Sequence, residues 1–562
     1  MKKTQFHFNI FLITKNFFDV INLFKNVVRA IYDLLRDTSE RKKSVMRYYF
    51  MQRRLFLLCM IVLSCFFLFS CKKAKNEVSQ SDVPNHHVII TYLTTGDKPG
   101  SNGTSIMLEK LNDRLNKLCN AELEIYYIPW NNYQTNYNLK LSENDGSLDL
   151  IGTATDWLDA WKNVNLGNFM PLTDEMIQTY APKTWASVSK EHWDMCRADG
   201  KIYLMPEDNF TQWTNHGFMY RTDWAREAGL NGVHSWEDLT KYMSYVKKAK
   251  NVIPWDSNGS SSTYHPEGYI RSKSDFIIAD GITSTNMFGT RKSNLNKIYS
   301  PFIEGNELVE YAKLMRQWNN EGFWPKNVLT ANAGGRDNRD EFLHGLTGVE
   351  QHHTQTWYTQ IYNQIKENVP GADTDFFWFG EESGNIVYQS ITHGAMAISA
   401  ASKHPERALM VYDLIRNDKE CYNLMNYGIE GVQFERNAQG YREKIKGSHG
   451  ITTNYWWGRN DDLEVRDTAT AWDVFDRINA TYSKYKIDYP FSQIVWDLSS
   501  ISNEVDAVAD VYGSYMGNIS YGQVADPVAY VAEFRQELKK AGIDKIIAEL
   551  QKQLDAFHSS NR

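Results

Sequence analysis

Between residues 87 and 151 the chain alternates between strand-like and helix-like patterns. His87–Thr95 (HVIITYLTT) is β-branched and aromatic, and it stops at the turn-forming residues of Gly96–Gly100. Apolar residues then recur every three or four positions, as in an amphipathic helix: Met107, Leu108, Leu111, Leu115 and Leu118. Two further strands follow, one with Leu123, Ile125 and Tyr127 at alternate positions and one at Leu148–Ile151, with a helical stretch from Asn131 between them. This alternation predicts a parallel α/β sheet.

Ligands of such sheets bind beyond the carboxyl ends of the strands, where the connecting loops gather. Three loops occupy that position in the predicted sheet: Gly96–Gly103, Trp130–Tyr133 and Thr153–Trp157. We therefore expect a binding site at this edge.

Length and composition limit the class of protein. A chain of 562 residues exceeds what one hydrophobic core supports, so at least two lobes are expected. The hydrophobic fraction of 42% with 23% charged residues is typical of a globular body and not of a multi-span membrane protein. A net charge of −7 gives no general attraction to nucleic acid, so no nucleic-acid partner is expected.

The six cysteines form no CxxC pair and no Cys/His cluster with zinc spacing. Three of them lie in or just after an apolar leader, and Cys119, Cys196 and Cys421 remain as an odd set of buried thiols. The sequence therefore predicts no disulfide framework, no metal site and no cofactor.

The N-terminal part indicates export. Arg53 and Arg54 precede an apolar run, Leu55–Phe69, that is shorter than the about 20 residues of a membrane span. We interpret residues 51–70 as a signal peptide, residues 71–86 as a polar tether and residues 1–50 as a doubtful extension, with Met46 or Met51 as the start. The junction Leu68-Phe69-Ser70-Cys71 resembles a bacterial lipobox, which implies that Cys71 becomes the mature N-terminus and carries acyl chains such as palmitate. Phe69 departs from that motif, and cleavage elsewhere or a plain N-terminal anchor is the alternative.

Several segments of the mature chain resemble the extracellular solute-binding proteins of ABC importers. They are TTGDKPG, LDLIGTATDWLDAW, NFMPLTDEMIQTYAPKTWAS, GKIYLMPE and YRTDWAREAGL with the following SWEDLTKY. The stretch HPERALMVYDLIRNDKECYNLMNYGIEGVQFE is similar to the narrower LipO-type lipoproteins, whose C-terminal region is a domain of unknown function. Their glycine-asparagine signature appears here as Gly458-Arg459-Asn460 and so departs from the pattern.

The resemblance implies an α/β, two-lobed, type 2 periplasmic-binding protein fold with a hinge between the lobes and a helical C-terminal extension. Lobe one is expected to hold residues 87–212, lobe two residues 213–346, and the chain to return to lobe one over residues 347–453. Residues 454–562 then complete the lobes, and the apolar stripe of the last helix is expected to pack in a core. The implied protein is a monomer, anchored by lipid at the outer side of the cell membrane, that delivers its ligand to the membrane permease of an ABC importer.

A sugar presents apolar C–H faces and a rim of hydroxyls, so its site needs aromatic rings beside hydrogen-bonding groups. The candidate ligand-binding residues with this chemistry are Asp97, Trp130, Asp156, Trp157, Glu207, Asp208, Trp213, His352, Trp357, Glu430 and Trp457. Each has a plain structural alternative: a loop ring packed on its own lobe, a helix-capping Asp156, a surface His352, or a Glu430 that braces the turn of Tyr427–Gly431. No third ligand stands at metal spacing from the adjacent His352 and His353, so we expect contact with a ligand other than a metal.

The lobes are expected to close on the ligand about two short crossover segments, Asn209–Gly217 and Leu346–His353. Trp130, Trp157 and Trp357 are expected to become more buried on binding. Apart from Lys98 and Arg459, no Arg/Lys cluster occupies the candidate loops, which predicts an uncharged or weakly charged ligand.

Two other functions are open to this sequence. Glu207, Asp208, Glu350 and Glu430 are carboxylates of the kind that a glycoside hydrolase pairs, although no motif fixes such a pair and no catalytic residue is predicted. The same fold also suits a peptide-binding or adhesive surface lipoprotein. We expect a binding protein for a small polar solute, an oligosaccharide, and not an enzyme.

Overall fold

The computed structural model describes residues 84–208, 216–257, 264–283, 285–330, 338–492 and 494–560. The predicted signal peptide, Cys71 and nearly all of the tether lie outside these residues, as do Trp213 and most of the expected crossover Asn209–Gly217. None of the helices within the described residues combines the length and the apolar character that crossing a membrane requires.

A mixed five-stranded sheet forms the centre of the first hydrophobic core, in the order β2-β1-β3-β13-β6. β1 pairs in parallel with β2 and with β3, as the alternating pattern predicts, whereas β13 runs antiparallel to β3 and to β6. The strands are β1 (Val88–Thr95), β2 (Ala121–Ile128), β3 (Leu150–Thr153), β6 (Met205–Pro206) and β13 (Ala395–Ile398). β13, from late in the chain, therefore lies between β3 and β6 in a sheet that begins near residue 88.

Helices cover this sheet with apolar faces. Met107, Leu111 and Leu115 are fully buried on the helix that the sequence predicts after β1. The helices of this core are α3 (Gly103–Cys119), α4 (Tyr133–Glu143), α5 (Ala160–Asn165), α6 (Asp174–Tyr180), α7 (Pro182–Ser187), α8 (Lys190–Met195), α16 (Pro405–Asn417) and α17 (Lys419–Tyr427). Two small hairpins accompany them, β4 (Arg197–Ala198) with β5 (Lys201–Ile202), and β14 (Phe434–Arg436) with β15 (Arg442–Lys444).

The second core surrounds two three-stranded antiparallel sheets. One has β7 (His216–Arg221) between β11 (Val349–His353) and β12 (Thr374–Trp378), and the other has the order β10-β9-β8 from β8 (Phe276–Ile278), β9 (Gly289–Arg291) and β10 (Asn294–Tyr299). The helices before its C-terminal part are α9 (Thr222–Glu227), α10 (Trp236–Ala249), α11 (Tyr264–Lys273), α12 (Glu307–Glu321), α13 (Asn338–Leu343), α14 (Thr354–Thr356), α15 (Tyr362–Asn368) and α18 (Trp472–Tyr482). Short turns complete them: a π-helical turn at Trp357–Ile361 and 3₁₀ turns at Glu381–Ser383 and Asp461–Leu463.

The sequence predicts that the chain returns to the first core from residue 347, but in the structure the return comes later. β11 and β12 both pair with β7, so the residues from 349 to 378 belong with the second sheet. Contact with the first core resumes near Thr392 and Gly394, whose carbonyls accept hydrogen bonds from the backbone N–H groups of Thr155 (3.1 Å) and Glu207 (2.8 Å). The polar run before Trp357 resembles a loop because strand pairing with β7 is a long-range contact that a local pattern does not carry.

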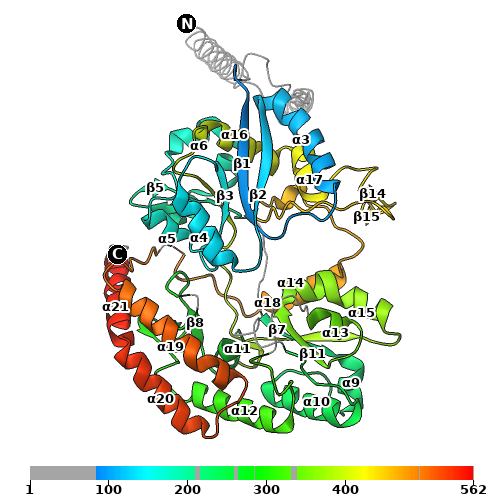
Figure 1. The fold of residues 1–562 in the computed structure, drawn as a ribbon, viewed down its shortest axis with the longest axis vertical. Coiled ribbons are helices and arrows are strands. Elements are labelled where there is room, and N and C mark those ends of the chain that lie inside the picture. The colour runs from blue at the N-terminus through cyan, green and yellow to red at the C-terminus, as the bar shows by residue number, and fades with distance from the viewer. Residues whose placement is uncertain are drawn as a thin grey trace, which may run out of the picture. The chain divides into compact units, whose positions relative to one another are not determined.

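The C-terminal region packs into the second core as three helices, α19 (Ser502–Ser520), α20 (Pro527–Lys540) and α21 (Ile543–Ser560) (Figure 1). The predicted apolar stripe of the last helix is buried there, with Ile543, Ile546, Leu550 and Leu554 at most 1% exposed.

Candidate functional site

A cavity of about 1510 Å³ lies where the loops of the first sheet meet residues of the second core. The first core contributes the loops that follow β2 and β3, including Trp130 and Asp156, together with Trp456 and Trp457. The second core contributes the loop after β8 with Asp280, and residues of β11. The cavity thus lies at the predicted edge of the parallel strands. Residues of the second core border its other side.

Four indole rings line one side of the cavity, and we call Trp130, Trp157, Trp456 and Trp457 the tryptophan wall. Trp130 stacks on Trp456 with ring centres 5.7 Å apart, and on Trp157 at 6.2 Å. Trp157 stacks in turn on Trp457 at 5.6 Å. The wall is a cluster of stacked apolar rings, of which Trp130, 44% exposed, is the most accessible member.

The first sheet fixes the position of the wall. The Nε1 of Trp457 donates to Thr94 Oγ1 of β1 (3.3 Å), and the Thr94 hydroxyl donates to the carbonyl of Asn454 (2.7 Å). The Trp457 ring lies directly against Gly152 of β3, where a Cβ atom would stand 2.2 Å from the indole nitrogen. Only glycine leaves room for the ring at this strand position.

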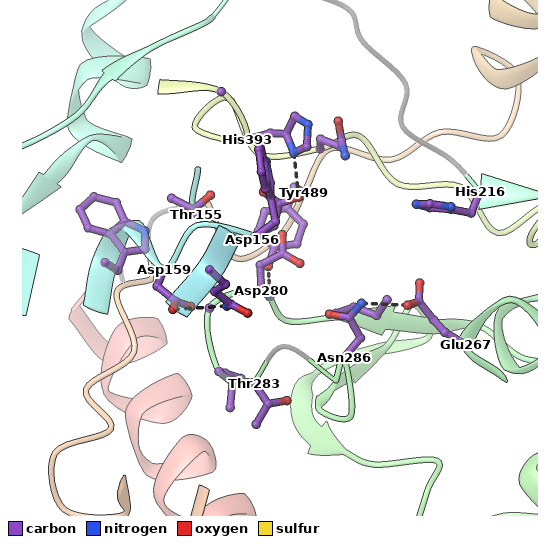
Figure 2. A pocket seen from close by; sticks show the side chains of 18 of the residues that line it. Thr155, Asp156, Asp159, His216, Glu267, Asp280, Thr283, Asn286, His393 and Tyr489 are labelled. Atoms are coloured by element: carbon purple, nitrogen blue, oxygen red, sulfur yellow. Dashed lines mark hydrogen bonds and ion pairs between the residues drawn. The ribbon is translucent and has the colours of Figure 1, made fainter. Parts of the chain in front are cut away.

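Next to the wall lies a group of half-buried ionisable side chains (Figure 2). His393 Nδ1 and Asp156 Oδ2 are 2.7 Å apart, and the backbone N–H of Asp280 donates to the Tyr489 hydroxyl (2.6 Å). Burial would lower the pKa of His393, but the charge of Asp156 and its contact with the His393 ring favour the protonated form, and the pKa is raised. The contact with Asp156 therefore favours the protonated form of His393.

Two of these carboxyls hold a proton at neutral pH. Burial raises the pKa of Glu207 to about 8, although Arg459 and His393 act in the opposite direction. Burial and the neighbouring charge of Asp156 raise the pKa of Asp280 to about 8 as well. A neutral carboxyl both donates and accepts hydrogen bonds, as a sugar hydroxyl does.

Several buried acceptor atoms along the cavity have no hydrogen-bond partner within the described part of the chain. They are Asp156 Oδ1, Glu207 Oε1, Gln351 Oε1 and Gln389 Oε1. A buried acceptor without a partner costs about 1–3 kcal/mol, so a ligand that brings hydroxyl donors gains free energy by meeting them. We call these four side chains the acceptor group.

Three histidines, His216, His352 and His353, lie close together on β7 and β11 at the same cavity. Burial holds the pKa of His216 and of His353 well below the ordinary value, so both are neutral. No group of His, Cys, Asp or Glu suited to a metal ion occurs among the residues for which the structure gives positions.

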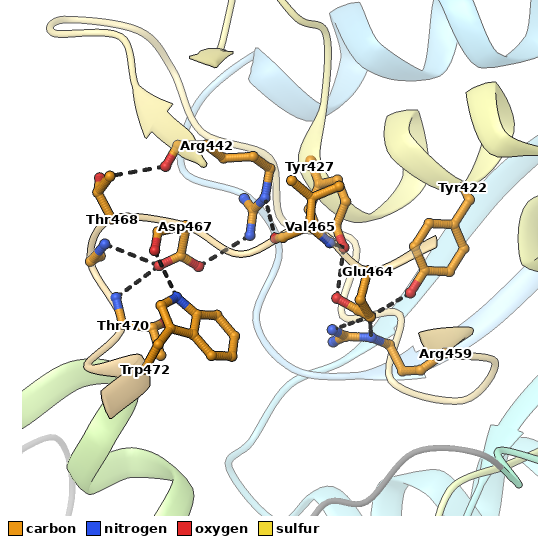
Figure 3. Close-up of polar contacts among 11 residues, drawn as sticks. Tyr422, Tyr427, Arg442, Arg459, Glu464, Val465, Asp467, Thr468, Thr470 and Trp472 are labelled. Atoms are coloured by element: carbon orange, nitrogen blue, oxygen red, sulfur yellow. Dashed lines mark hydrogen bonds and ion pairs between the residues drawn. The ribbon is translucent and has the colours of Figure 1, made fainter. Parts of the chain in front are cut away.

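Arg459 lies at the cavity in the segment that passes from the first core to the second. It pairs with Glu464, which also accepts a hydrogen bond from Tyr427 (2.7 Å) (Figure 3). Burial would lower the pKa of Arg459, but the Glu464 charge outweighs it and raises the pKa. Further along, Arg442 bonds the Val465 carbonyl (3.0 Å), so this crossing segment is held by charged contacts on the first-core side.

Comparisons with known proteins decide the family. A model described as "Bacterial extracellular solute-binding protein" matches residues 100–415, more than half of the chain. The chain belongs to this family. A second model, a domain of unknown function (DUF3502), matches residues 490–559 of this solute-binding protein.

Relatives and solved structures agree with that assignment. A carbohydrate ABC transporter substrate-binding protein of Streptococcus pneumoniae serotype 4 is 22% identical over 495 residues, covering 86% of this chain and 93% of the relative. The N-glycan transport solute binding protein (NgtS) from Streptococcus pneumoniae superposes with a TM-score of 0.66 at 19% identity, covering 85% of this chain and 100% of that one. Its complexes with Man1GlcNAc and Man5GlcNAc give TM-scores of 0.61 and 0.54 at 19% and 18% identity, covering 84% and 85% of this chain and 99% and 100% of theirs. These likenesses confirm the predicted two-lobed α/β fold of a type 2 periplasmic-binding protein with a helical C-terminal region.

The solute-binding protein brings six of the predicted ligand residues to one cavity: Trp130, Asp156, Trp157, Glu207, His352 and Trp457. Trp213 lies outside the described residues. Asp97, Asp208, Trp357 and Glu430 are placed elsewhere.

Trp357 is fully buried and does not reach the cavity. After β11 the chain turns into α14 and a π-helical turn, and this places the ring against Phe376 (5.5 Å) with its Nε1 donating to Thr374 Oγ1 (2.9 Å). Trp357 has no exposed surface in the structure, so it cannot become more buried on ligand binding, contrary to the prediction from the sequence.

The remaining three residues, Asp97, Asp208 and Glu430, do not line the cavity and make their contacts with first-core residues. Asp97 is exposed and accepts a hydrogen bond from the backbone N–H of Trp130 (3.4 Å). Asp208 is buried beside His192. Glu430 is exposed and pairs with Arg436 (3.3 Å). This contact agrees with the alternative in which Glu430 braces the turn that follows Tyr427.

Sequence reasoning missed several cavity residues, among them His393, Asp280 and Tyr489. His393 follows the polar segment Gln389–Thr392 directly before a buried strand, and that position is the signal by which it was detectable. Asp280 and Tyr489 are far apart in sequence and meet only through tertiary packing. Trp456 belongs to the dense aromatic run 455–457, in which only Trp457 was selected.

Proposed function

We propose that this solute-binding protein captures an oligosaccharide in the cavity between its two cores and presents it to the membrane permease of an ABC importer. The tryptophan wall beside the acceptor group is the observation that supports this proposal. Aromatic faces suit the C–H faces of sugar rings, and unpaired acceptors suit their hydroxyl donors.

The size of the cavity favours a ligand of several sugar units. Pockets for drug-sized ligands usually measure about 300–1,000 Å³, and the cavity of about 1510 Å³ is larger. The relative from Streptococcus pneumoniae is a carbohydrate ABC transporter substrate-binding protein, and NgtS was crystallised with Man1GlcNAc and Man5GlcNAc. Both agree with an oligosaccharide.

The charge of the cavity favours an uncharged ligand. Acidic lining residues outnumber basic ones, with Asp156, Asp159, Glu207, Glu267, Asp280, Asp497 and Asp506 against Lys162, Arg271, Arg339 and Arg459. With the pKa values of Glu207 and Asp280 raised to about 8, the remaining acidic and basic side chains nearly balance, so the cavity has no net positive charge that would attract a phosphorylated or multi-carboxylate ligand.

A thermal-shift screen tests the proposal, because a ligand that binds only the folded state raises its apparent stability. The short probe is Man1GlcNAc and the long probe Man5GlcNAc, with maltose, maltohexaose and unrelated peptides beside them. We expect one or more of the oligosaccharides to raise the melting temperature, and Trp157→Ala to remove that shift. A chain stabilised only by peptides, or by none of these compounds, would overturn the assignment.

Glycoside hydrolysis is the second candidate, since Glu207 has the raised pKa of a general acid and Asp156 lies in the same cavity. We propose binding without turnover. Incubation with a panel of aryl glycosides is expected to release no aglycone; release that Glu207→Gln abolishes would establish an enzyme.

We propose further that Cys71 is the mature, lipid-modified N-terminus and that it holds the protein at the outer face of the cell membrane as a monomer. The apolar run Leu55–Phe69 before Ser70-Cys71 supports this. Stable anchoring generally takes more than one acyl chain. Cys71→Ala is expected to release the protein from membranes or leave the precursor uncleaved, and an unchanged mass and fractionation would contradict the proposal.

A further inference from the structure

The C-terminal region, residues 490–559, shares the core of the second lobe. Val508, Phe534 and Leu550 from its three helices are all fully buried in the same hydrophobic cluster as residues of α12. The Arg535 side chain also bonds the Phe302 carbonyl (3.0 Å). This packing fixes the region relative to the cavity, so whatever it presents to the cavity has a defined position.

One stretch of this region lines the cavity. It consists of Trp496, Asp497, Leu498 and Ser499, followed by Ser502, Val505, Asp506 and Ala509 on α19. The α19 residues are spaced by three, one and three positions and therefore share one face of the helix, while Val508 and Tyr512 turn to the core. One helix thus packs with one face and borders the cavity with the other.

The segment before α19 is held in place by the last helix. The backbone N–H of Asp497 donates to Gln553 Oε1 (2.9 Å), and Gln553 Nε2 donates to the Asp497 carbonyl (2.7 Å). Glu504 on α19 pairs with Lys545 on α21 (2.6 Å). These contacts give the segment the fixed geometry that a binding surface needs.

The chemistry of this stretch differs from that of the tryptophan wall. Trp496 lines the cavity and is 4% exposed. Its Nε1 is buried and has no hydrogen-bond partner in the described part of the chain. Ser499, Ser502 and Asp506 add hydroxyl and carboxylate groups that are open to solvent. A buried donor beside hydroxyls and a carboxylate matches the oxygen-rich rim of a sugar.

We propose that the C-terminal region is part of the ligand-binding machinery: Trp496, Ser499, Ser502 and Asp506 form a second sugar subsite, separate from the tryptophan wall, for the units of an oligosaccharide that extend past the stacked rings. This inference rests on the proposed carbohydrate-binding function. It gives the domain of unknown function a role in selecting ligands by length.

Calorimetry on the full-length chain with Man1GlcNAc and Man5GlcNAc tests the subsite, with maltose and maltohexaose as a second pair. Ser502→Trp places a bulky ring on the cavity face of α19, and Asp506→Asn removes a charge there. We expect Ser502→Trp to reduce the affinity for the long member of a binding pair about tenfold more than for the short member, and Asp506→Asn about threefold more.

Ser514→Trp and Asp510→Asn are the matched controls, since both residues are exposed on α19 and do not line the cavity. They are expected to leave both affinities unchanged. Equal losses for short and long probes in Ser502→Trp, or no loss, would overturn the subsite while leaving the proposed function intact. A wild-type chain that binds neither pair would overturn the proposed function and this inference with it.

Discussion

Trp457 is the most buried ring of the tryptophan wall, and its place depends on the missing side chain of Gly152. Gly152→Ala puts a methyl group where the indole lies, so either the strand or the ring has to move. Overpacking of this kind typically costs about 1–3 kcal/mol, and we expect urea unfolding to show a loss of that size together with weaker ligand binding.

Gly513→Ala is the control for that substitution. Gly513 lies on α19 with open space around a Cβ atom. Replacing a helical glycine by alanine stabilises by about 0.5–1 kcal/mol, so this variant is expected to gain stability and keep its affinity. A Gly152→Ala chain as stable as wild type would mean that Trp457 does not occupy the described position.

Glu207 makes stability depend on pH in a defined window. Its carboxyl has an ordinary pKa of 4.5 and a raised pKa of about 8 in the folded protein. Below pH 4.5 both states hold the proton and the group has no effect. As the pH rises toward 8, the unfolded chain ionises first, and the free energy of unfolding of the wild type falls.

Glu207→Gln removes this pH dependence, because glutamine does not ionise. We expect the variant to match the wild type near pH 4 and to be more stable near pH 8, by on the order of 3 kcal/mol. Urea unfolding at a series of pH values measures the difference. Two parallel pH profiles would show that Glu207 is ionised in the folded protein.

Single residues were predictable from sequence where local position determined their role. Trp130, Asp156 and Trp157 come within four residues after strands whose carboxyl ends border the cavity, and all three line it. Trp357 and Glu430 have suitable side-chain chemistry but do not line the cavity. The helical turn after β11 buries Trp357, and an ion pair with Arg436 holds Glu430 at the surface. Chemistry alone therefore selected too many residues.

Among the elements, α21 gives the sharpest test of how the C-terminal region is built. Leu550 is fully buried in the core that also contains α12. Leu550→Ala is expected to lower the free energy of unfolding by about 2–5 kcal/mol. Since the core is shared, the signals of the C-terminal helices and of the second lobe should shift together in one denaturant transition.

An early, separate transition of the C-terminal helices in this variant would show that they fold as an independent domain. Asp544→Ala serves as the control, because this residue is exposed on the same helix. It is expected to change stability by less than about 0.5 kcal/mol.

Elements with local periodicity were predictable, whereas elements defined by their partners were not. The first strands and helices and the stripe of α21 follow the sequence pattern. β13 joins the first sheet, and β11 and β12 join β7, through contacts between residues far apart in the chain. No repeat or spacing in one sequence encodes such pairings, and the expected return at residue 347 was misplaced for this reason.

At the scale of the whole molecule, the cavity predicts closure. Both cores line it, and the described chain passes between them near residues 388–394 and 457–471. The expected crossover Leu346–His353 is largely strand β11 of the second core, so we expect these two described segments to take its place in the hinge. The expected crossover Asn209–Gly217 lies almost wholly outside the described residues and stays a prediction. A ligand that contacts both cores shifts the protein toward a closed state.

Small-angle scattering is expected to show a smaller radius of gyration in the presence of the oligosaccharide that gives the largest thermal shift. Trp130, which is 44% exposed, should also become less accessible to acrylamide. Trp157→Ala with the same sugar is the control and should keep the radius of the free protein. An unchanged radius at saturating ligand in the wild type would remove closure from the mechanism.

The close spacing of the four indoles has an optical consequence. Ring centres 5.6 to 6.2 Å apart bring the electronic transitions of neighbouring indoles into coupling, so the wall absorbs as one chiral chromophore. Coupled transitions give paired circular dichroism bands of opposite sign. If the proposed sugar ligand contacts Trp130, the rotation between the coupled indoles is expected to change, so circular dichroism of the unlabelled protein is expected to respond to ligand binding.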